Sequence, residues 1–291
     1  MKKYRLILLC AVLLLLALPA LGEEEGVIVY AQPEEAVEGL EIRFLDIGTG
    51  DSFFLRCGDE TMLVDGGIST DGKRLQKYFT AQEIDHFTYI VNTHCHDDHI
   101  DGLTYLLSKG FGADEVLSPY RMEKTEAHHA RLVKQVRAQG LLYRMVGDGD
   151  TLRLGDAEVR FFRDTQEDAM RNCNDNSLVM TVRYGDRSVL LLSDIGGRVQ
   201  PYYASTYGMQ LRVDIVKSMH HGINLFVPEL LETVRPALVV CTSAQRRVPR
   251  FVRQMERNNL PALYASEGII HAVTDGTVWH VWQGGHMNKD E

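Results

Sequence analysis

The sequence predicts an α/β (α+β) fold. Strand-like segments and helix-like segments are interleaved along the chain, and this mixture suits two sheets placed between helical layers. The hydrophobic content of 45% over 291 residues is ample for a packed core. We find no internal repeat and no low-complexity region, which excludes a repeat architecture.

The first half of the expected domain contains four strands and three helices. Alternation and β-branched content predict strands at about 41–47, 51–57, 61–65 and 87–91. Periodicity and composition predict helices at 71–80, from 102 to 107, and at 122–139. Gly66 and Gly67 break the third strand, and Gly140 is a good stop for the last of these helices.

The second half begins with strands and then alternates with helices. Strands are expected near 142–146, 151–154, 157–163, 177–184, 188–193, 213–218, 237–241, 268–273 and 277–282. A hairpin turn at 184–187 joins two of them. Helices are expected after Asp194 and at 227–234 and 246–258.

The N-terminus has the composition of a secretory signal peptide. Basic residues precede an apolar run at 6–18, and small residues at Ala20 and Gly22 favour cleavage after Gly22. The alternative is an uncleaved membrane anchor, for which the apolar run is short. No second apolar stretch is long enough to cross a bilayer. We therefore expect a secreted or extracytoplasmic protein without stable membrane insertion after cleavage.

This division gives four segments and an acidic body. They are a signal peptide at 1–22, an acidic linker at 23–39, one domain at 40–283 and a polar tail at 284–291. Removing the three positive charges of the signal segment takes the formal charge from -9 to -12. Acidity counts against general nucleic-acid binding, although bound metals can screen phosphates locally. Four cysteines remain, and their irregular spacing favours free, mostly buried thiols.

The run His94-Cys95-His96-Asp97-Asp98-His99 lies where a strand gives way to a helix. A tight turn after a strand directs alternate side chains toward one point. His94 and His96 can therefore share one metal ion, while Asp98 and His99 reach a second. Imidazole and carboxylate ligands suit zinc or manganese, and we expect two divalent ions, zinc first. A polar surface loop with chance histidines is the alternative.

The run is the His-x-His-x-Asp-His signature of the metallo-β-lactamase superfamily, which this chain resembles over residues 40–283. The resemblance implies an αββα sandwich. It is strongest to the domain of this type in the competence DNA-uptake channel ComEC, and weaker to exported phosphorylcholine esterases. The other shared stretches are Phe44–Ser52, Leu63–Gly67, Asn174–Val179, Leu191–Asp194 and Lys217–Gly222.

The resemblance implies roles for three further residues. Asp194, at the end of an apolar strand, would bridge the two ions, although the family usually has Gly where this chain has Ser193. A helix cap is its alternative role. His220 would bind the second ion, and His221 would face the substrate as an acid or a phosphate contact. The reverse assignment of these two histidines stays open.

The superfamily's common third histidine is missing from the loop at 172–177, which is rich in Asn. An amide oxygen of Asn174 or Asn176, the Cys173 thiolate or water would complete the first ion's shell. Turn formation is the alternative role of this loop. Oxygen-rich coordination would shift the metal preference toward manganese.

Several other polar residues receive structural or open interpretations. The turn residues Asp46, Gly48, Gly50 and Asp51 are expected to be mostly structural, while Asp65 either accepts a hydrogen bond from a metal-bound histidine or forms a turn. His128 and His129 are expected to be solvated, and His271, His280 and His286 structural. Arg246 and Arg247 either bind an anionic substrate or lie on a helix surface.

The function that these residues predict is metal-assisted hydrolysis by an exported phosphodiesterase. Asp98 and His221 are the expected catalytic residues: Asp98 orients the attacking water and His221 stabilises the leaving group. The substrate is a small or polymeric phosphodiester, either nucleic acid such as DNA or a cell-envelope phosphodiester. One alternative is an ester or amide hydrolase such as a β-lactamase or lactonase, although the β-lactamases keep the third histidine that this chain lacks. The other is a non-enzymatic metal-binding envelope module. The sequence is silent on the oligomeric state.

Overall fold

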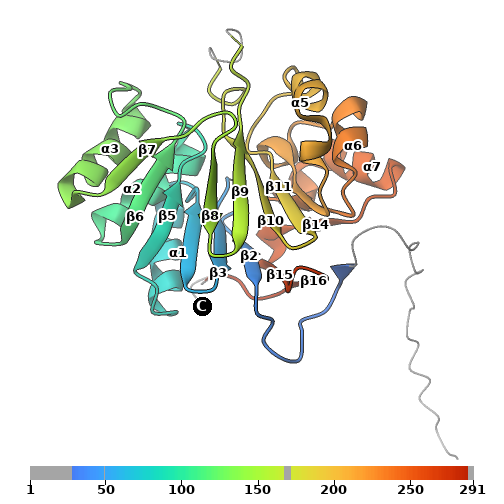
Figure 1. Cartoon of the computed structure of the whole chain (residues 1–291), viewed down its shortest axis with the longest axis horizontal. Helices are drawn as coiled ribbons and strands as arrows, with labels where there is room; N and C mark the ends of the chain where they lie inside the picture. The colour runs from blue at the N-terminus through green and yellow to red at the C-terminus, as the bar shows by residue number, and fades with distance from the viewer. Residues whose placement is uncertain (1–27, 49, 167–171, 288–291) are drawn as a thin grey trace, which may run out of the picture.

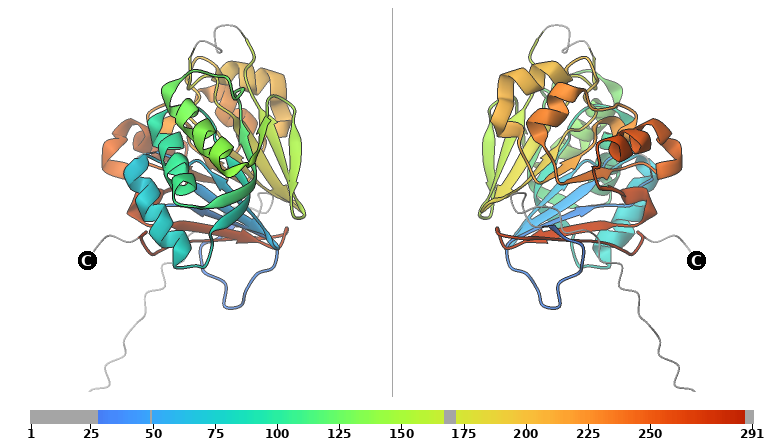
Figure 2. Two further views of the ribbon diagram at one scale, coloured as in Figure 1. Left: turned by 90° about the vertical axis from the view of Figure 1, so that its left-hand side faces the viewer. Right: turned by 90° about the vertical axis from the view of Figure 1, so that its right-hand side faces the viewer.

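The computed structural model describes residues 28–48, 50–166 and 172–287. Within these residues two sheets pack face to face, and helices cover both outer faces (Figure 1). In Figure 2, the left view looks onto the side that carries the first helices of the chain, and the right view looks onto the side that carries the later helices. This arrangement confirms the expected αββα sandwich.

The first sheet has nine strands among the described residues, in the order β1-β16-β15-β2-β3-β4-β5-β6-β7. Their bounds are β1 Ile28–Val29, β2 Leu40–Phe44, β3 Phe53–Cys57, β4 Glu60–Val64, β5 His86–Val91, β6 Gly112–Ser118, β7 Leu142–Met145, β15 Ile270–Thr274 and β16 Trp279–Gln283. Strands β4, β5, β6 and β7 run parallel to one another, so their carboxyl ends share one edge.

The second sheet has seven strands in the described part of the chain, in the order β14-β13-β12-β11-β10-β9-β8. Their bounds are β8 Thr151–Leu154, β9 Ala157–Phe162, β10 Val179–Tyr184, β11 Arg187–Leu191, β12 Ile215–Lys217, β13 Leu238–Cys241 and β14 Ala262–Tyr264. Strands β11, β12, β13 and β14 are parallel, which again gathers their carboxyl ends.

Helices form the two outer layers. The first layer contains α1 Ser69–Thr80, α2 Asp97–Ser108 and α3 Ala127–Gln139, and the second contains α5 Gln200–Tyr207, α6 Pro228–Val234 and α7 Pro249–Arg257. Short 3-10 turns are η1 Gly208–Leu211, η2 Met219–Gly222, η3 Gln245–Arg247 and η4 Ala265–Glu267.

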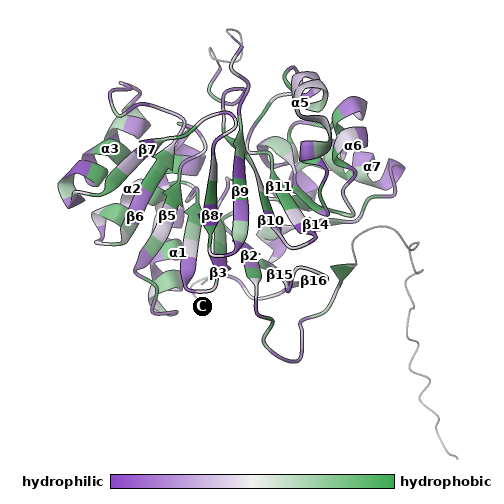
Figure 3. Cartoon of the chain, in the orientation of Figure 1, coloured by the Kyte–Doolittle hydropathy of each residue, from purple (hydrophilic) through white to green (hydrophobic). Residues whose placement is uncertain are grey.

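The alternation of side chains along each strand produces the layers. In β11, Val189 and Leu191 point into the core between the sheets, whereas Leu190 packs under the second helical layer. Both faces of this strand are covered, which explains its continuous apolar sequence. Strands such as β9 instead carry hydrophobic and hydrophilic residues in turn (Figure 3).

The observed elements differ from the expected ones at several places. Helix α2 begins at Asp97, not near 102, so the last part of the metal run lies in its first turn. Helix α3 begins at Ala127 because the Glu126 carboxylate caps its N-terminus and the preceding residues form a turn. Strands β1, β6 and β14 were not expected.

The expected N-terminal signal segment at 1–22 lies outside the described residues. Two residues of the expected linker, Ile28 and Val29, pair with β16. Within the described ranges, no helix is long and apolar enough to cross a membrane. The boundaries of the expected segments stay predictions.

Candidate metal centre

The candidate site lies at the edge where the carboxyl ends of parallel strands from both sheets meet. The metal run follows β5, Asp194 follows β11, and the pair His220-His221 follows β12. The turn between β2 and β3 adds Asp51, whose backbone N–H donates to the carbonyl of Asp98. Residues from four separate segments therefore converge on one point.

The first two histidines of the run point toward each other. His94 Nε2 lies 3.1 Å from His96 Nδ1, and the two ring centroids are 4.8 Å apart. His94 is fully buried, whereas His96 is exposed at the mouth of the site. These two nitrogen atoms are therefore close enough to bind one cation, and their assignment as ligands stays a prediction.

Asp194 is the centre of the site. Its Oδ2 atom lies close to the Nε2 atoms of four histidines, at 3.8 Å from His94, 3.2 Å from His99, 3.8 Å from His220 and 3.4 Å from His221. Asp194 is buried at the end of an apolar strand, where a carboxylate is costly unless charges surround it. The arrangement matches a carboxylate shared between two cations.

Asp98 closes the site from the helix side. Its Oδ1 lies 3.9 Å from His99 Nε2, and its Oδ2 lies 3.4 Å from His221 Nε2. Partial burial by itself would raise the pKa of Asp98, but the adjacent imidazoles of His221 and His99 hold it well below its usual range. Asp98 is therefore an anion at neutral pH.

The site passes a test of fit for divalent cations. His99 Nε2, His221 Nε2 and Asp194 Oδ1 are buried side-chain atoms without a hydrogen-bond partner among the described residues. Buried polar atoms rarely lack a partner, and a cation at this point would supply one. Ligand atoms of Asp51, His99, Asp194 and His221 all lie within 4.8 Å of one another. Imidazole and carboxylate donors suit zinc and neighbouring divalent ions.

A second carboxylate orients His99 from behind. Asp65 Oδ2 lies 2.7 Å from His99 Nδ1, and the same carboxylate accepts from the backbone N–H and hydroxyl of Thr93. Such a partner directs the opposite ring nitrogen toward a metal. Of the two roles that the sequence left open for Asp65, the structure shows the hydrogen bond to histidine.

Asp51 orients the ring of His221 in the same way. Its Oδ1 lies 3.1 Å from His221 Nδ1 and accepts a hydrogen bond from the Thr242 hydroxyl, while Oδ2 pairs with the buried ammonium of Lys217. Burial alone would raise the pKa of Asp51, but Lys217 and His221 lower it to about 2. The expectation that Asp51 is mainly a turn residue was therefore incomplete.

The carboxylates set the proton affinity of the buried histidines. Burial lowers the pKa of His94 well below its usual value. Burial also acts to lower the pKa of His99, but Asp194 and Asp65 outweigh it and raise that pKa to about 10. The same negative field that favours a proton on His99 favours a metal cation at this point.

Backbone strain is concentrated at the site. Of the seven non-glycine residues with positive φ in the described chain, four belong to it: Asp65, Ser193, His220 and His221. Left-handed backbone costs energy for non-glycine residues and persists where the surrounding structure demands it. Here it aims two consecutive histidines, His220 and His221, toward the same carboxylate.

The two histidines of this pair differ in burial and surroundings. His221 is 1% exposed and belongs to the four-residue cluster, whereas His220 is 29% exposed and its ring contacts Asn224. We expected His220 as the ligand and His221 toward the substrate. The placement favours the reverse assignment, which the sequence also left open.

The sequence predicted free thiols for the four cysteines that follow the signal segment. For Cys95 and Cys173 this prediction is wrong. Cys95 and Cys173 form a disulfide, while Cys57 and Cys241 are free and buried. The disulfide removes the Cys173 thiolate as a ligand of the first ion. Asn176 Oδ1 accepts from Arg163, whereas Asn174 Oδ1 is buried without a partner among the described residues.

A pocket of about 440 Å³ opens beside His96 and is lined by Tyr120, Lys124, Glu126 and the disulfide, among others. His128 also lines the pocket. His129 is buried against Tyr120 and Tyr143, so the expectation that both histidines are solvated was wrong for His129.

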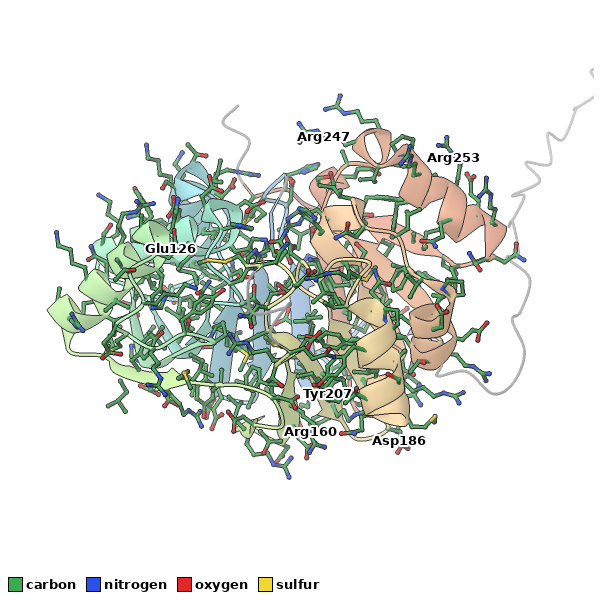
Figure 4. All side chains as sticks on the ribbon, turned by 90° about the horizontal axis from the view of Figure 1, so that it is seen from above. Glu126, Arg160, Asp186, Tyr207, Arg247 and Arg253 are labelled. Atoms are coloured by element: carbon green, nitrogen blue, oxygen red, sulfur yellow. A yellow bond between two sulfur atoms is a disulfide. The ribbon has the colours of Figure 1, made fainter. Side chains whose placement is uncertain are left out.

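Figure 4 views the molecule from above. Glu126 lies on the side formed by the first helices of the chain. The exposed Arg247 of η3 lies at the edge of the other side (Figure 4).

A sequence profile of the metallo-β-lactamase superfamily matches residues 45–230, which include the metal run, Asp194 and both histidines of η2. The chain belongs to this superfamily. Its members are usually metal-dependent hydrolases, and this chain carries a possible metal site in its described residues. No curated protein matches the sequence.

Solved structures show the same fold at low identity. The diiron β-hydroxylase CmlA from Streptomyces venezuelae is 17% identical, with a TM-score of 0.51 over 80% of this chain and 54% of that chain. The metallo-β-lactamase fold protein YhfI from Bacillus subtilis is 12% identical, with a TM-score of 0.50 over 78% of this chain and 96% of that chain. This chain thus spans about half the length of the β-hydroxylase. These likenesses concern the fold alone.

Proposed function

We propose that this protein is an exported, dinuclear metal-dependent phosphodiesterase. The observation that carries the metal chemistry is the convergence of four histidine Nε2 atoms within 3.8 Å of Asp194 Oδ2. When bound, two divalent cations supply positive charge that polarises a phosphoryl group and lowers the pKa of a water.

The residues divide into two ligand groups that share Asp194. We assign His94 and His96 to the first cation, because their nitrogen atoms face each other. We assign Asp98, His99 and His221 to the second, because their ligand atoms surround one point. Zinc is the expected ion and manganese the alternative.

The residues around these groups supply the rest of the proposed chemistry. Asp98, partly exposed and anionic, is placed to orient the attacking water. His220 is the more exposed histidine of its pair, and burial lowers its pKa, so its neutral ring is placed to contact the substrate. The pocket beside His96 offers room for the rest of a phosphodiester.

Phosphodiesters are the favoured substrates because both resemblances in the sequence, to the ComEC domain and to phosphorylcholine esterases, concern proteins that act on them. The disulfide supports an extracytoplasmic location, since disulfides persist in oxidising compartments. Nucleic acid and cell-envelope phosphodiesters are equally good candidates.

The test is cleavage of labelled single-stranded DNA and of a chromogenic phosphodiester by the chain loaded with zinc or manganese. Loss of both activities is expected in the Asp98→Ala/His99→Ala double variant. His86→Ala, which removes an exposed histidine at the opposite end of β5, should retain them. Turnover of a β-lactam or a lactone but of no phosphodiester would overturn the phosphodiesterase assignment. Absence of any turnover, with both cations bound, would favour a metal-binding module.

A further inference from the structure

The disulfide Cys95–Cys173 occupies an unusual place, because Cys95 stands between the two histidines assigned to the first cation. The two cysteines are 78 positions apart, and their Cα atoms are 6.5 Å apart. Cys95 follows β5 of the first sheet, and Cys173 precedes β10 of the second. The bond therefore joins the two sheets across the mouth of the site.

The loop that carries Cys173 is also tied to the loop that carries Asp194. Asp175 Oδ1 accepts a hydrogen bond from the backbone N–H of Gly196, and the N–H of Leu178 donates to the carbonyl of Thr93. The Tyr120 hydroxyl lies 3.3 Å from Cys173 Sγ. The disulfide is thus the covalent part of a brace that joins the metal run, the Asn-rich loop and the Asp194 loop.

His96 depends on this brace more than the other ligands do. His99 has Asp65 behind its ring, and His221 has Asp51 and Thr242. For His96, the structure shows one side-chain hydrogen-bond contact, to His94, and the ring is exposed. Its position therefore rests on its backbone, which the neighbouring Cys95 anchors.

We propose that the Cys95–Cys173 disulfide is a positioning element for the first metal site, which holds His96 against His94 in place of a hydrogen-bonded partner. The disulfide also forms a wall of the pocket beside His96, so it sets the shape of the space next to that site. This inference rests on the ligand assignment of the proposed function.

The test measures metal affinity apart from activity. The Cys95→Ala/Cys173→Ala double variant is titrated with zinc against a chromogenic chelator, beside the wild-type chain. Alanine introduces no new ligand. Removing a partner that orients a metal ligand typically weakens affinity about 10- to 100-fold. We expect a loss of this size for one of the two ions and little change for the other.

A general loss of stability is separated from loss of positioning by two controls. Cys57→Ala removes a buried free thiol of the inter-sheet core, and both ions should bind it as they bind the wild type. If the double variant does not fold, folded wild type is reduced with a water-soluble phosphine and capped with iodoacetamide. The phosphine takes oxygen from water as the disulfide becomes two thiols, and each thiolate then displaces iodide to form a thioether.

The outcomes distinguish this inference from the function on which it rests. Weaker binding of one ion, in the double variant or in the capped protein, supports the positioning role. Unchanged affinity for both ions, with only a lower melting temperature, overturns it and leaves the metal site intact. Absence of any bound ion in the wild type overturns the ligand assignment itself and this inference with it.

Discussion

Asp51 and Lys217 form a fully buried ion pair against the candidate metal centre. The Lys217 ammonium also donates to the carbonyl of Ser193 and lies 3.8 Å from Asp194 Oδ1. The pair therefore connects the β2–β3 turn of the first sheet to the end of β12 in the second. It keeps a negative charge on Asp51, where that residue orients His221.

Breaking this pair should destabilise the fold strongly. Lys217→Met leaves the Asp51 carboxylate buried without its cation, and removal of one partner of a buried pair costs about 3–5 kcal/mol. The measurement is the free energy of unfolding in urea. The double variant Lys217→Met/Asp51→Asn has neither the ammonium nor the carboxylate. Its loss of unfolding free energy should therefore be smaller than the sum of the losses in the two single variants. Additive losses would show that the two residues act independently.

The two histidines of η2 should respond differently to alanine. His221→Ala removes a buried ring that belongs to the cluster, so we expect one bound cation to be lost. His220→Ala removes a more exposed ring, so we expect both cations to remain while kcat for a phosphodiester falls. Cation content per chain after dialysis separates the two cases. Loss of a cation from His220→Ala alone would restore the assignment first expected from the sequence.

Protonation of Asp275 at low pH should reduce the stability of the turn between β15 and β16. The Asp275 carboxylate accepts hydrogen bonds from the hydroxyl and N–H of Thr277 and from the N–H of Val278, and these lower its pKa to about 2. Because the folded pKa is below the ordinary value near 3.8, this contribution to stability is present above about pH 4 and is lost as the pH falls toward 2.

The check is a comparison of wild type with Asp275→Ala at two pH values. The difference in urea midpoint between them should be larger at pH 6 than at pH 3. A difference that does not change with pH would show that the carboxylate charge contributes nothing to this turn.

The close approach of α2 to the end of β4 requires glycine at 102. A Cβ atom on Gly102 would lie 1.8 Å from the carbonyl oxygen of Gly66, and a backbone atom cannot move aside as a side chain can. Gly102→Ala should therefore cost about 1–3 kcal/mol or more of stability and displace the helix that carries Asp98 and His99. The matched control is Gly147→Ala, where a Cβ meets no atom within 4 Å. Thermal unfolding of both variants tests this, and equal melting temperatures would contradict it.

Most strands and helices could be predicted because their apolar residues repeat with the period of the element. The strands that were missed have weak patterns. Strand β6 contains Gly112, Asp114 and Glu115, and β14 is three residues long, so neither contrasts with a loop. The start of α2 was missed because its first turn consists of ligands, whose composition reflects chemistry and not helix periodicity.

The superfamily and the sandwich could be predicted from the sequence, and the metal run could be found in it, because these depend on local composition and on short motifs. The tertiary structure instead fixes which residues contact the far side of each candidate ligand. Cys95 and Cys173 are 78 positions apart, and Asp51 and His221 are 170 apart, so packing of the two sheets brings each pair together. It also decided the directions of His220 and His221, because left-handed backbone at both positions breaks the alternation by which a strand would aim them.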